Sequence, residues 1–498
     1  MARLTRTEPM TGPSDSHDST RRRFLAAGGL LAGTAGLAGC ISGTGSKPTA
    51  TETTDDEPAD GQTADGETTE AVAAESPGAA AWPQFGHDAS NAGYARSASG
   101  PGADAALAWR FDAKTPTMNA SPVVADGTVY APGSGDPGYV HAIDAETGES
   151  VWRFEPAGYA SCAPAVADGR VYFGTWSKKF YALDAATGEQ VWASDVGHRF
   201  GSSSPAVSDG TVYVGTVGDG PMVVSGEEDE EKFESCAVLA LDAESGDERW
   251  RYDDFGEKEN VGSSIAVADG RVYFGGESAV YALDADSGSV AWSREVATHP
   301  QSSPAVVDGT VYYGGPSDAE DGPPARLYAL DAKSGETVWT AGIDDTSLRT
   351  SPAVADGTVY VAASSTRACL LSGGGVATTE TDDGGNGTDA ARTEDGDSDC
   401  SGTNRGRLYA LDAASGERRW TAEFRTDTRS SPAVADGTVY AGNGDGLSAV
   451  TTDGENLWRI GFEGKRDDGP YLDSSPAVAG GRVFVGASDG RLRAIGTK

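Results

Sequence analysis

Hydrophobic and polar positions alternate along the chain in a phrase whose first half returns eight times. The phrase begins Ser-Pro-Ala-Val-x-Asp-Gly-x-Val-Tyr and, after a variable gap, continues Tyr-Ala-Leu-Asp-Ala-x-Ser/Thr-Gly-x-x-x-Trp. The short apolar runs have a period of two residues, which predicts β-strands, and the Asp-Gly and Thr/Ser-Gly pairs predict tight turns because Gly tolerates positive φ. Each copy therefore predicts four antiparallel strands, which make one blade of a β-propeller.

The positions of the copies also predict how the ring closes. The first half begins at Ser121, Ala163, Ser204, Ser264, Ser303, Ser351, Ser431 and Ser475, and the second half closes at Trp152, Trp192, Trp250, Trp292, Trp339, Trp420 and Trp458. The eighth copy has no closing Trp, whereas Trp109 precedes the first copy. We predict that residues 107–111 supply the fourth strand of the last blade, which leaves no open sheet edge. The sequence thus predicts an all-β, eight-bladed propeller over residues 82–498, closed by its N-terminal strand.

The first 81 residues have a different composition. Arg21 and Arg22 resemble a twin-arginine export motif, a mild apolar run follows, and Leu37-Ala38-Gly39-Cys40 resembles a lipobox. We read residues 1–40 as a signal peptide and expect lipid on Cys40, which would anchor the protein to the outer face of the cytoplasmic membrane. Residues 41–81 are acidic and contain almost no large apolar side chain, so we expect a disordered tether.

The charge balance excludes one class of partner. Asp and Glu number 76 against 38 Lys and Arg, which gives a formal charge of -38. Such a surface repels nucleic acid. The acid is spread along the chain, which favours adaptation to high salt; a single acidic patch for cations or a basic partner is the alternative.

The segments that end in Trp resemble a known motif. Residues 142–152, 182–192, 240–250, 282–292, 329–339, 410–420 and, less completely, 449–458 resemble the tryptophan-docking motif of the quinoprotein-like propellers with PQQ-like repeats. The opening Trp-Pro-Gln-Phe-Gly-His-Asp of residues 82–88 is similar to leaders of that family. The resemblance implies that each Trp, Trp109 included, is wedged between neighbouring blades with a Gly packed on its ring.

The resembled family has two branches. Its dehydrogenases hold pyrroloquinoline quinone and calcium on the propeller axis and typically carry a disulfide of adjacent cysteines; its non-catalytic members include the BamB-type lipoproteins. This sequence has no Cys-Cys pair. We therefore expect a BamB-like, haloarchaeal-type lipoprotein without catalytic residues, resident cofactor or metal, and keep quinone and calcium as the alternative.

One face of the predicted propeller gathers the candidate binding residues. The insertions at 217–236, 315–326 and 364–407 all join a second strand to a third, so they lie on the same face as the connections between blades. That face also collects cations that are unusual in so acidic a chain: Lys178, Lys179, His198, Arg199, His299, Arg349 and Arg429, with Arg425 nearby. We interpret them as a funnel for an anionic or glycan ligand; solvated loop charges are the alternative.

The third insertion carries two further candidates. Cys369 and Cys400 bracket it, so a disulfide at its base is one prediction and free buried thiols are the other. Asn386 begins a glycosylation sequon inside it. Its acidic residues 378–399 match no EF-hand spacing, which favours disorder over a calcium site.

The leading functional hypothesis is a monomeric, lipid-anchored binding or scaffold protein at the cell surface, whose partner is a protein or a surface glycan. A quinone-dependent dehydrogenase and a dedicated glycan-binding module are the two alternatives. The sequence by itself does not name the ligand.

Overall fold

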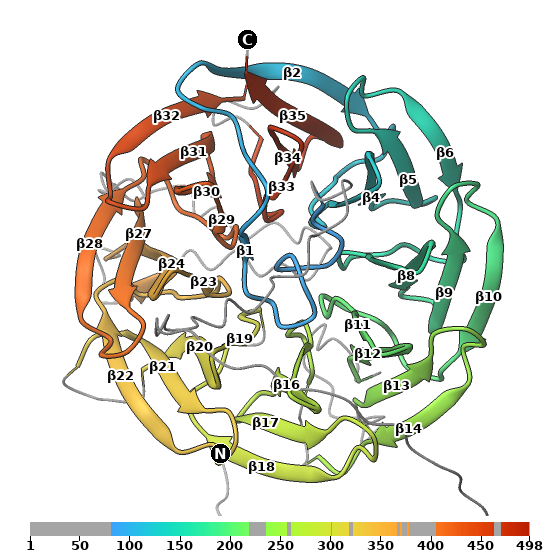
Figure 1. Cartoon of the computed structure of the whole chain (residues 1–498), viewed down its shortest axis with the longest axis horizontal. Coiled ribbons are helices and arrows are strands. Elements are labelled where there is room, and N and C mark those ends of the chain that lie inside the picture. Colours follow the sequence, from blue (N-terminus) through green and yellow to red (C-terminus); the bar gives the residue numbers. More distant parts are fainter. Residues whose placement is uncertain are drawn as a thin grey trace, which may run out of the picture. The chain divides into compact units, whose positions relative to one another are not determined.

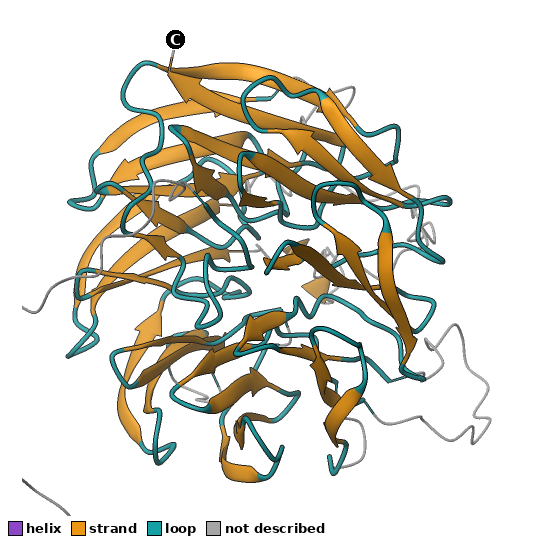
Figure 2. Ribbon diagram, turned by 45° about the vertical axis from the view of Figure 1, so that its right-hand side comes forward, coloured by secondary structure: helices purple, strands orange, loops and turns teal. Residues whose placement is uncertain are grey.

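The computed structural model describes residues 81–497 except 219–235, 256–259, 300, 318–321, 366–368, 371–375, 378–404 and 463–469. Within this part of the chain the structure is all-β, with strands and loops only (Figure 2). Accordingly, no helix long and apolar enough to cross a membrane occurs among these residues.

Eight four-stranded antiparallel sheets follow one another around a central channel (Figure 1). From the channel outwards, blades 1 to 4 consist of β3 (Val123–Ala125), β4 (Thr128–Gly133), β5 (Tyr139–Asp144) and β6 (Ser150–Phe154); β7 (Ala165–Ala167), β8 (Arg170–Gly174), β9 (Lys179–Asp184) and β10 (Gln190–Asp195); β11 (Ala206–Ser208), β12 (Thr211–Gly215), β13 (Val238–Asp242) and β14 (Glu248–Tyr252); and β15 (Ala266–Ala268), β16 (Arg271–Gly275), β17 (Ala279–Asp284) and β18 (Val290–Glu295).

Blades 5 to 8 continue the ring in the same order. They consist of β19 (Ala305–Val307), β20 (Thr310–Pro316), β21 (Ala325–Asp331) and β22 (Thr337–Ile343); β23 (Ala353–Ala355), β24 (Thr358–Ser365), β27 (Arg405–Asp412) and β28 (Arg418–Glu423); β29 (Ala433–Ala435), β30 (Thr438–Asn443), β31 (Gly446–Thr451) and β32 (Asn456–Gly461); and β33 (Ala477–Ala479), β34 (Arg482–Gly486), β35 (Arg491–Thr497) and β2 (Ala105–Asp112). The short strands β25 (Cys369–Leu370) and β26 (Val376–Ala377) pair in the third insertion.

The predicted eight-bladed fold and its closure are confirmed. β2 pairs antiparallel with β35 as the outermost strand of the last blade, so the early segment completes the sheet that the end of the sequence begins. The strand is longer than the predicted 107–111, because the pairing extends from Ala105↔Thr497 to Asp112↔Arg491.

Strand direction defines two faces of the propeller. The Asp-Gly turns between first and second strands and the Thr/Ser-Gly turns between third and fourth strands lie on one face, which we call the turn face. The connections between second and third strands and between blades lie on the other, which we call the insertion face, because the three large insertions belong to it.

The hydrophobic core lies between neighbouring sheets. Small and β-branched side chains of the inner strands meet large aromatic ones, as where Tyr172 and Phe180 of blade 2 pack against Val212 and Leu239 of blade 3. Side chains on both faces of each inner strand are buried, because a blade is covered on both sides by its neighbours.

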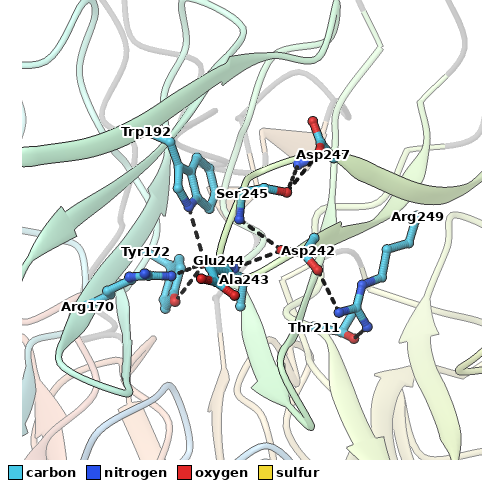
Figure 3. A network of polar contacts seen from close by, with 10 residues as sticks. All are labelled: Arg170, Tyr172, Trp192, Thr211, Asp242, Ala243, Glu244, Ser245, Asp247 and Arg249. Carbon is cyan, nitrogen blue, oxygen red and sulfur yellow. Dashed lines mark hydrogen bonds and ion pairs between the residues drawn. The ribbon is translucent and has the colours of Figure 1, made fainter.

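At seven of the eight junctions between blades, one backbone carbonyl accepts the docking indole, and Figure 3 shows the junction between blades 2 and 3. The carbonyl of Ala243, in the turn after β13, accepts hydrogen bonds from the indole of Trp192 (3.2 Å), the hydroxyl of Tyr172 (3.1 Å) and the guanidinium of Arg170 (2.8 Å), all from the preceding blade. The Asp242 carboxylate holds the same turn, and its pKa is lowered to about 2 by Arg249 and then by hydrogen bonds from Ser245 and Glu244.

The same indole contact recurs around the ring. Seven indole N–H groups donate across a junction at 2.8 to 3.2 Å, and the donors are Trp109, Trp152, Trp192, Trp250, Trp292, Trp339 and Trp420. At each of these junctions a Gly with positive φ lies on the ring; a Cβ on Gly148 would come within 2.6 Å of Trp109.

Trp458 differs because its neighbour is the closing blade. β35 and β2 come from distant parts of the sequence, so no hairpin turn joins them and no equivalent carbonyl faces this indole. The Trp458 Nε1 is buried and has no hydrogen-bond partner among the described residues. The neighbouring Tyr440 hydroxyl donates instead to Pro101 (3.4 Å), in the segment that leads to β2.

Candidate functional site: the central channel and the insertion face

The innermost strands leave one row of backbone groups facing the channel. Each of these strands has three residues and pairs with only one strand of its own blade, so the amide of its central Val points away from its own sheet. An unpaired inner edge of this kind needs hydrogen-bond partners, because buried backbone N–H groups are costly to leave unsatisfied.

Residues 82–95 supply those partners, and we call them the axial segment. They wind around the channel wall and meet the central Val of seven blades in turn. Backbone carbonyls of Trp82, Pro83, Ala89, Ser90, Ala92 and Gly93 accept from Val124, Val166, Val267, Val306, Val354 and Val434 at 2.6 to 2.9 Å. The side-chain amide of Gln84 serves blade 3, because it accepts from the Val207 N–H (2.8 Å) and donates to the Val207 carbonyl (3.2 Å).

The direction of the axial segment follows from its pairings. Trp82 pairs antiparallel with Val124 of β3, so the chain runs there from the turn face towards the insertion face. β1 (Tyr94–Ala95) pairs parallel with β29 and runs back. Figure 1 shows this segment in blue at the centre of the ring, from which it continues outwards to β2.

Three residues fix the bend of the axial segment. Asp88 accepts hydrogen bonds from the backbone of Ser90 (3.0 Å) and Ala92 (3.4 Å). Asn91, which is 3 % exposed, donates to the carbonyls of Ile265 (3.0 Å) and Pro304 (3.2 Å) and so joins blades 4 and 5. Gly93 has a φ of 67°, and a Cβ there would lie 2.6 Å from the Ala353 Cβ.

A belt of serines encircles the channel on the insertion side of the axial segment. At seven of the eight junctions the backbone N–H of the residue two positions before a blade's first strand donates to the Ser hydroxyl of the next blade, at 2.8 to 3.1 Å; the acceptors are Ser204, Ser264, Ser303, Ser351, Ser431, Ser475 and Ser121. The junction from blade 1 to blade 2 lacks the contact because Ala163 stands where the other blades have Ser.

The recess beside the axial segment does not fit the quinone of the dehydrogenase branch. It is lined by Trp82, Phe85, Asn91 and the Ser-Pro pairs of blades 1, 6, 7 and 8, and it has room for about one water molecule. The axial segment lies beside it and hydrogen-bonds the inner strands of seven blades. Among the described residues no cluster of three His, Cys, Asp or Glu side chains is placed to hold a metal ion.

The predicted cations divide into two groups on the insertion face. Lys178 and Lys179 lie at the β8–β9 turn and His198 and Arg199 in the connection from β10 to β11, so these four belong to blades 2 and 3. His299, Arg349 and Arg429 precede β19, β23 and β29 and belong to blades 5 to 7. The seven residues thus lie on two arcs of the same rim, and the funnel for an anionic or glycan ligand stays a prediction.

The second group contains one base whose ionisation is suppressed. Burial, with Arg349 nearby, lowers the pKa of His299 to about 4, so this imidazole is neutral at pH 7. Its Nδ1 accepts from the Gln301 N–H (3.2 Å). His299 therefore contributes a dipole to the rim, whereas Arg349 and Arg429 keep their positive charge.

A buried carboxylate holds the neck of the third insertion. Asp345 has no exposed side-chain area and accepts hydrogen bonds from Arg407 (2.9 Å), Tyr409 (2.8 Å) and Ser365. Burial and this carboxylate raise the pKa of Tyr409 to about 12. Since Ser365 and Arg407 lie at the two ends of the insertion, the cluster fixes where it leaves the blade.

Several predicted sites lie outside the described residues: Arg21, Arg22 and Cys40, the tether 41–81 except its last residue, Asn386 and Cys400. Cys369 begins β25, but its side chain is not described. The remaining two cysteines are core residues. Burial raises the pKa of the Cys162 thiol to about 11, and Cys236 is fully buried beside Val238.

Eight blades joined by docked tryptophans define a propeller of the quinoprotein type. The family model described as outer membrane protein assembly factor BamB matches residues 98–230, 234–398 and 387–498, and the chain belongs to this family.

The named relatives are similar to only part of the chain or only to its fold. The quinohemoprotein alcohol dehydrogenase of Comamonas testosteroni is 31 % identical over 186 residues, which are 34 % of this chain and 25 % of that enzyme. The chain thus spans about a quarter of the length of this curated relative. The crystal structure of BamB from Moraxella catarrhalis has a TM-score of 0.53 at 17 % identity over 79 % of this chain and 98 % of that one. A europium-containing methanol dehydrogenase has a TM-score of 0.62 at 14 % identity, over 85 % of this chain and 98 % of that one.

Proposed function

We propose that this protein is a non-catalytic binding or scaffold propeller of the cell surface. The observation that carries the proposal is the filled axis: residues 82–95 engage seven blades where the enzymes of the resembled family would hold their cofactor. Binding would then fall to the insertion face, where three large insertions project from a rigid ring. Its partner would be a protein or a surface glycan, and the protein would act as a monomer.

The direction of the axial segment suits the proposed anchor. The chain enters the channel from the turn face, so a tether from lipidated Cys40 at the outer face of the cytoplasmic membrane would reach the propeller there. The insertion face would then be turned towards partners outside the cell. The family's description, an outer membrane assembly factor, is consistent with a protein partner.

A pull-down from native membranes in high salt tests the binding role. The full chain should retain a specific partner, and replacement of both Arg349 and Arg429 by Gln should reduce that retention if the blade 5–7 rim takes part. The control is Lys333→Gln, which removes one exposed cation from the turn face; each single Arg variant is charge-matched to it. No specific partner with the unaltered protein would contradict the proposal.

The second candidate is a quinone-dependent dehydrogenase, and the dehydrogenase relatives favour it. Pure protein would be titrated with pyrroloquinoline quinone and calcium, with quinone absorbance and alcohol- or sugar-dependent dye reduction as readouts. The filled axis predicts no uptake. Stoichiometric uptake with dye reduction would establish the enzyme and end the scaffold proposal.

A further inference from the structure

Trp176 differs from the other tryptophans of the chain. Of ten, eight hold the docking positions and Trp82 belongs to the axial segment. Trp176 lies in the short β8–β9 turn on the insertion face, where the corresponding turns of blades 4, 7 and 8 carry only small or charged residues. Blade packing does not require a large aromatic side chain at this turn.

The Trp176 indole is stacked and held in place. Its ring lies 5.7 Å from that of Tyr159, with 25° between their planes, and both side chains are half-buried. The Trp176 Nε1 donates to the Ser161 hydroxyl (3.0 Å), which in turn donates to the carbonyl of Gly201 (2.9 Å). The backbone N–H of Trp176 also donates to the Tyr159 carbonyl (3.1 Å). Two aromatic rings are therefore presented at the surface in a fixed arrangement, which lowers the entropy lost on binding.

The same contacts bring positive charge beside the rings. Two backbone hydrogen bonds join the turn of Trp176 to the connection that carries His198 and Arg199. The Phe200 N–H donates to the Thr175 carbonyl (3.2 Å), and the Val196 N–H donates to the Lys178 carbonyl (3.1 Å). Arg199 is exposed and acts electrostatically on the Tyr159 phenol, opposing the rise of its pKa that burial causes. Lys178 and Lys179 follow Trp176 in the sequence after Ser177.

We propose that Tyr159, Trp176 and Arg199, with Lys178 beside them, form a binding site for an acidic saccharide, a sugar ring that carries a carboxylate. The C–H face of a pyranose packs against the electron-rich face of an aromatic ring, and the guanidinium and ammonium groups pair with the carboxylate. In a chain of charge -38, attraction for an anion depends on such a local cluster. The inference rests on the proposed surface-binding function and names its ligand.

The test is a titration of the full chain with a tetrasaccharide of alternating glucuronic acid and N-acetylglucosamine, followed by tryptophan fluorescence and calorimetry. The neutral N-acetylglucosamine tetrasaccharide is the ligand control. We expect the acidic sugar to bind more tightly, with Trp176→Ala weakening it about tenfold or more through loss of the stacking surface. Arg199→Gln should weaken it about threefold at low salt and less at high salt.

Three outcomes overturn this assignment: no binding of the acidic tetrasaccharide, equal binding of the neutral one, or unchanged affinity in Trp176→Ala. Lys333→Gln should leave affinity within about twofold, because it removes a distant charge. If Trp176→Ala fails to fold, the affinities of Arg199→Gln and Lys178→Gln for the acidic tetrasaccharide decide, and unchanged affinity in both overturns the assignment. Partner retention from native membranes does not use the sugar, so loss of the saccharide site and loss of the scaffold role are separately visible.

Discussion

At the scale of single residues, one carbonyl at seven of the junctions accepts the docking indole of the preceding blade. At five of them a Tyr hydroxyl donates to the same carbonyl, and at two of these five an Arg does so as well, as at Ala243. Hydrogen bonds of this kind add to the large apolar area of each indole. The one buried indole N–H without an acceptor, among the residues described, is Trp458.

Trp152 and Trp458 form a matched pair for measuring this bond. Both are half-buried and both lie 5.8 Å from a Tyr ring of their own blade, but only Trp152 donates to a carbonyl, that of Ala185 at 2.9 Å. We expect Trp152→Phe to lower the free energy of unfolding by about 1 kcal/mol more than Trp458→Phe. Chemical denaturation in high salt measures both. Equal losses would show that the indole hydrogen bond contributes nothing net.

His141 makes the stability depend on pH. It is 2 % exposed, neither ring nitrogen has a hydrogen-bond partner among the described residues, and burial with Arg153 nearby lowers its pKa to about 4. The unfolded chain takes up this proton near pH 6.5 and the folded one only near pH 4, so stability falls as the pH drops through that window, by about 3 kcal/mol.

His141→Leu should remove this part of the acid sensitivity, because Leu239 fills the equivalent position in blade 3. Denaturation midpoints at pH 7.5 and pH 4.5 would give a smaller difference in the variant than in the unaltered protein. His299 has a similarly lowered pKa and is present in both the variant and the unaltered protein, so both still lose some stability at acidic pH. An identical difference in the two proteins would contradict the assignment to His141.

At the scale of elements, the axial segment and β2 both supply hydrogen-bond partners to open sheet edges, the first at the inner edges and the second at an outer edge. β2 covers the outer edge of the last blade, and residues 82–95 cover the inner edges of seven blades. Both belong to the stretch before the first repeat, so one segment satisfies backbone groups that the repeats leave open.

Substitution of Gly93 tests whether the axial segment is packed as described. Its positive φ and the close approach of Ala353 disfavour any side chain, so we expect Gly93→Ala to destabilise the propeller by about 2 kcal/mol or more. Gly102→Ala is the matched control, because a Cβ there would meet nothing within 4 Å. The measurement is the denaturation midpoint of each variant. If both variants lose the same amount, the axial segment is not held as described.

At the scale of the whole molecule, the serine belt and the docked tryptophans join the blades at two radii. The belt runs around the channel mouth and the indoles lie near the outer strands, so at six of the eight junctions the two blades are joined at both ends. Radial repetition of this kind leaves only short, protected edges.

Ala163→Ser should complete the belt. The new hydroxyl would face the Ser121 backbone N–H, as Ser204 faces that of Ala163 at 3.1 Å. We expect a gain of about 0.5 to 1 kcal/mol in the free energy of unfolding. Ser303→Ala is the reciprocal variant and should lose stability, because it leaves the Ser264 N–H without its acceptor. A loss with Ala163→Ser would mean that the site has no room for the hydroxyl.

The sequence by itself determined the blades, their number and the closure. These follow from local chemistry that every copy repeats: period-two strands, Gly turns and one Trp per copy, with Trp109 replacing the Trp missing from the last. It also indicated which face carries the insertions, because strand direction alternates. The predictions on export, lipidation, the disulfide and glycosylation remain predictions.

Only the tertiary structure decided what fills the channel and which surface groups meet. Residues 82–95 have no periodicity, and their partners are seven Val amides far apart in the sequence. No local pattern therefore predicts the hydrogen bonds between them. The need for partners on eight inner edges was a signal that could have found it. Tyr159 and Trp176 likewise stack because the β6–β7 connection and the β8–β9 turn meet, and no pattern in the sequence predicts that contact.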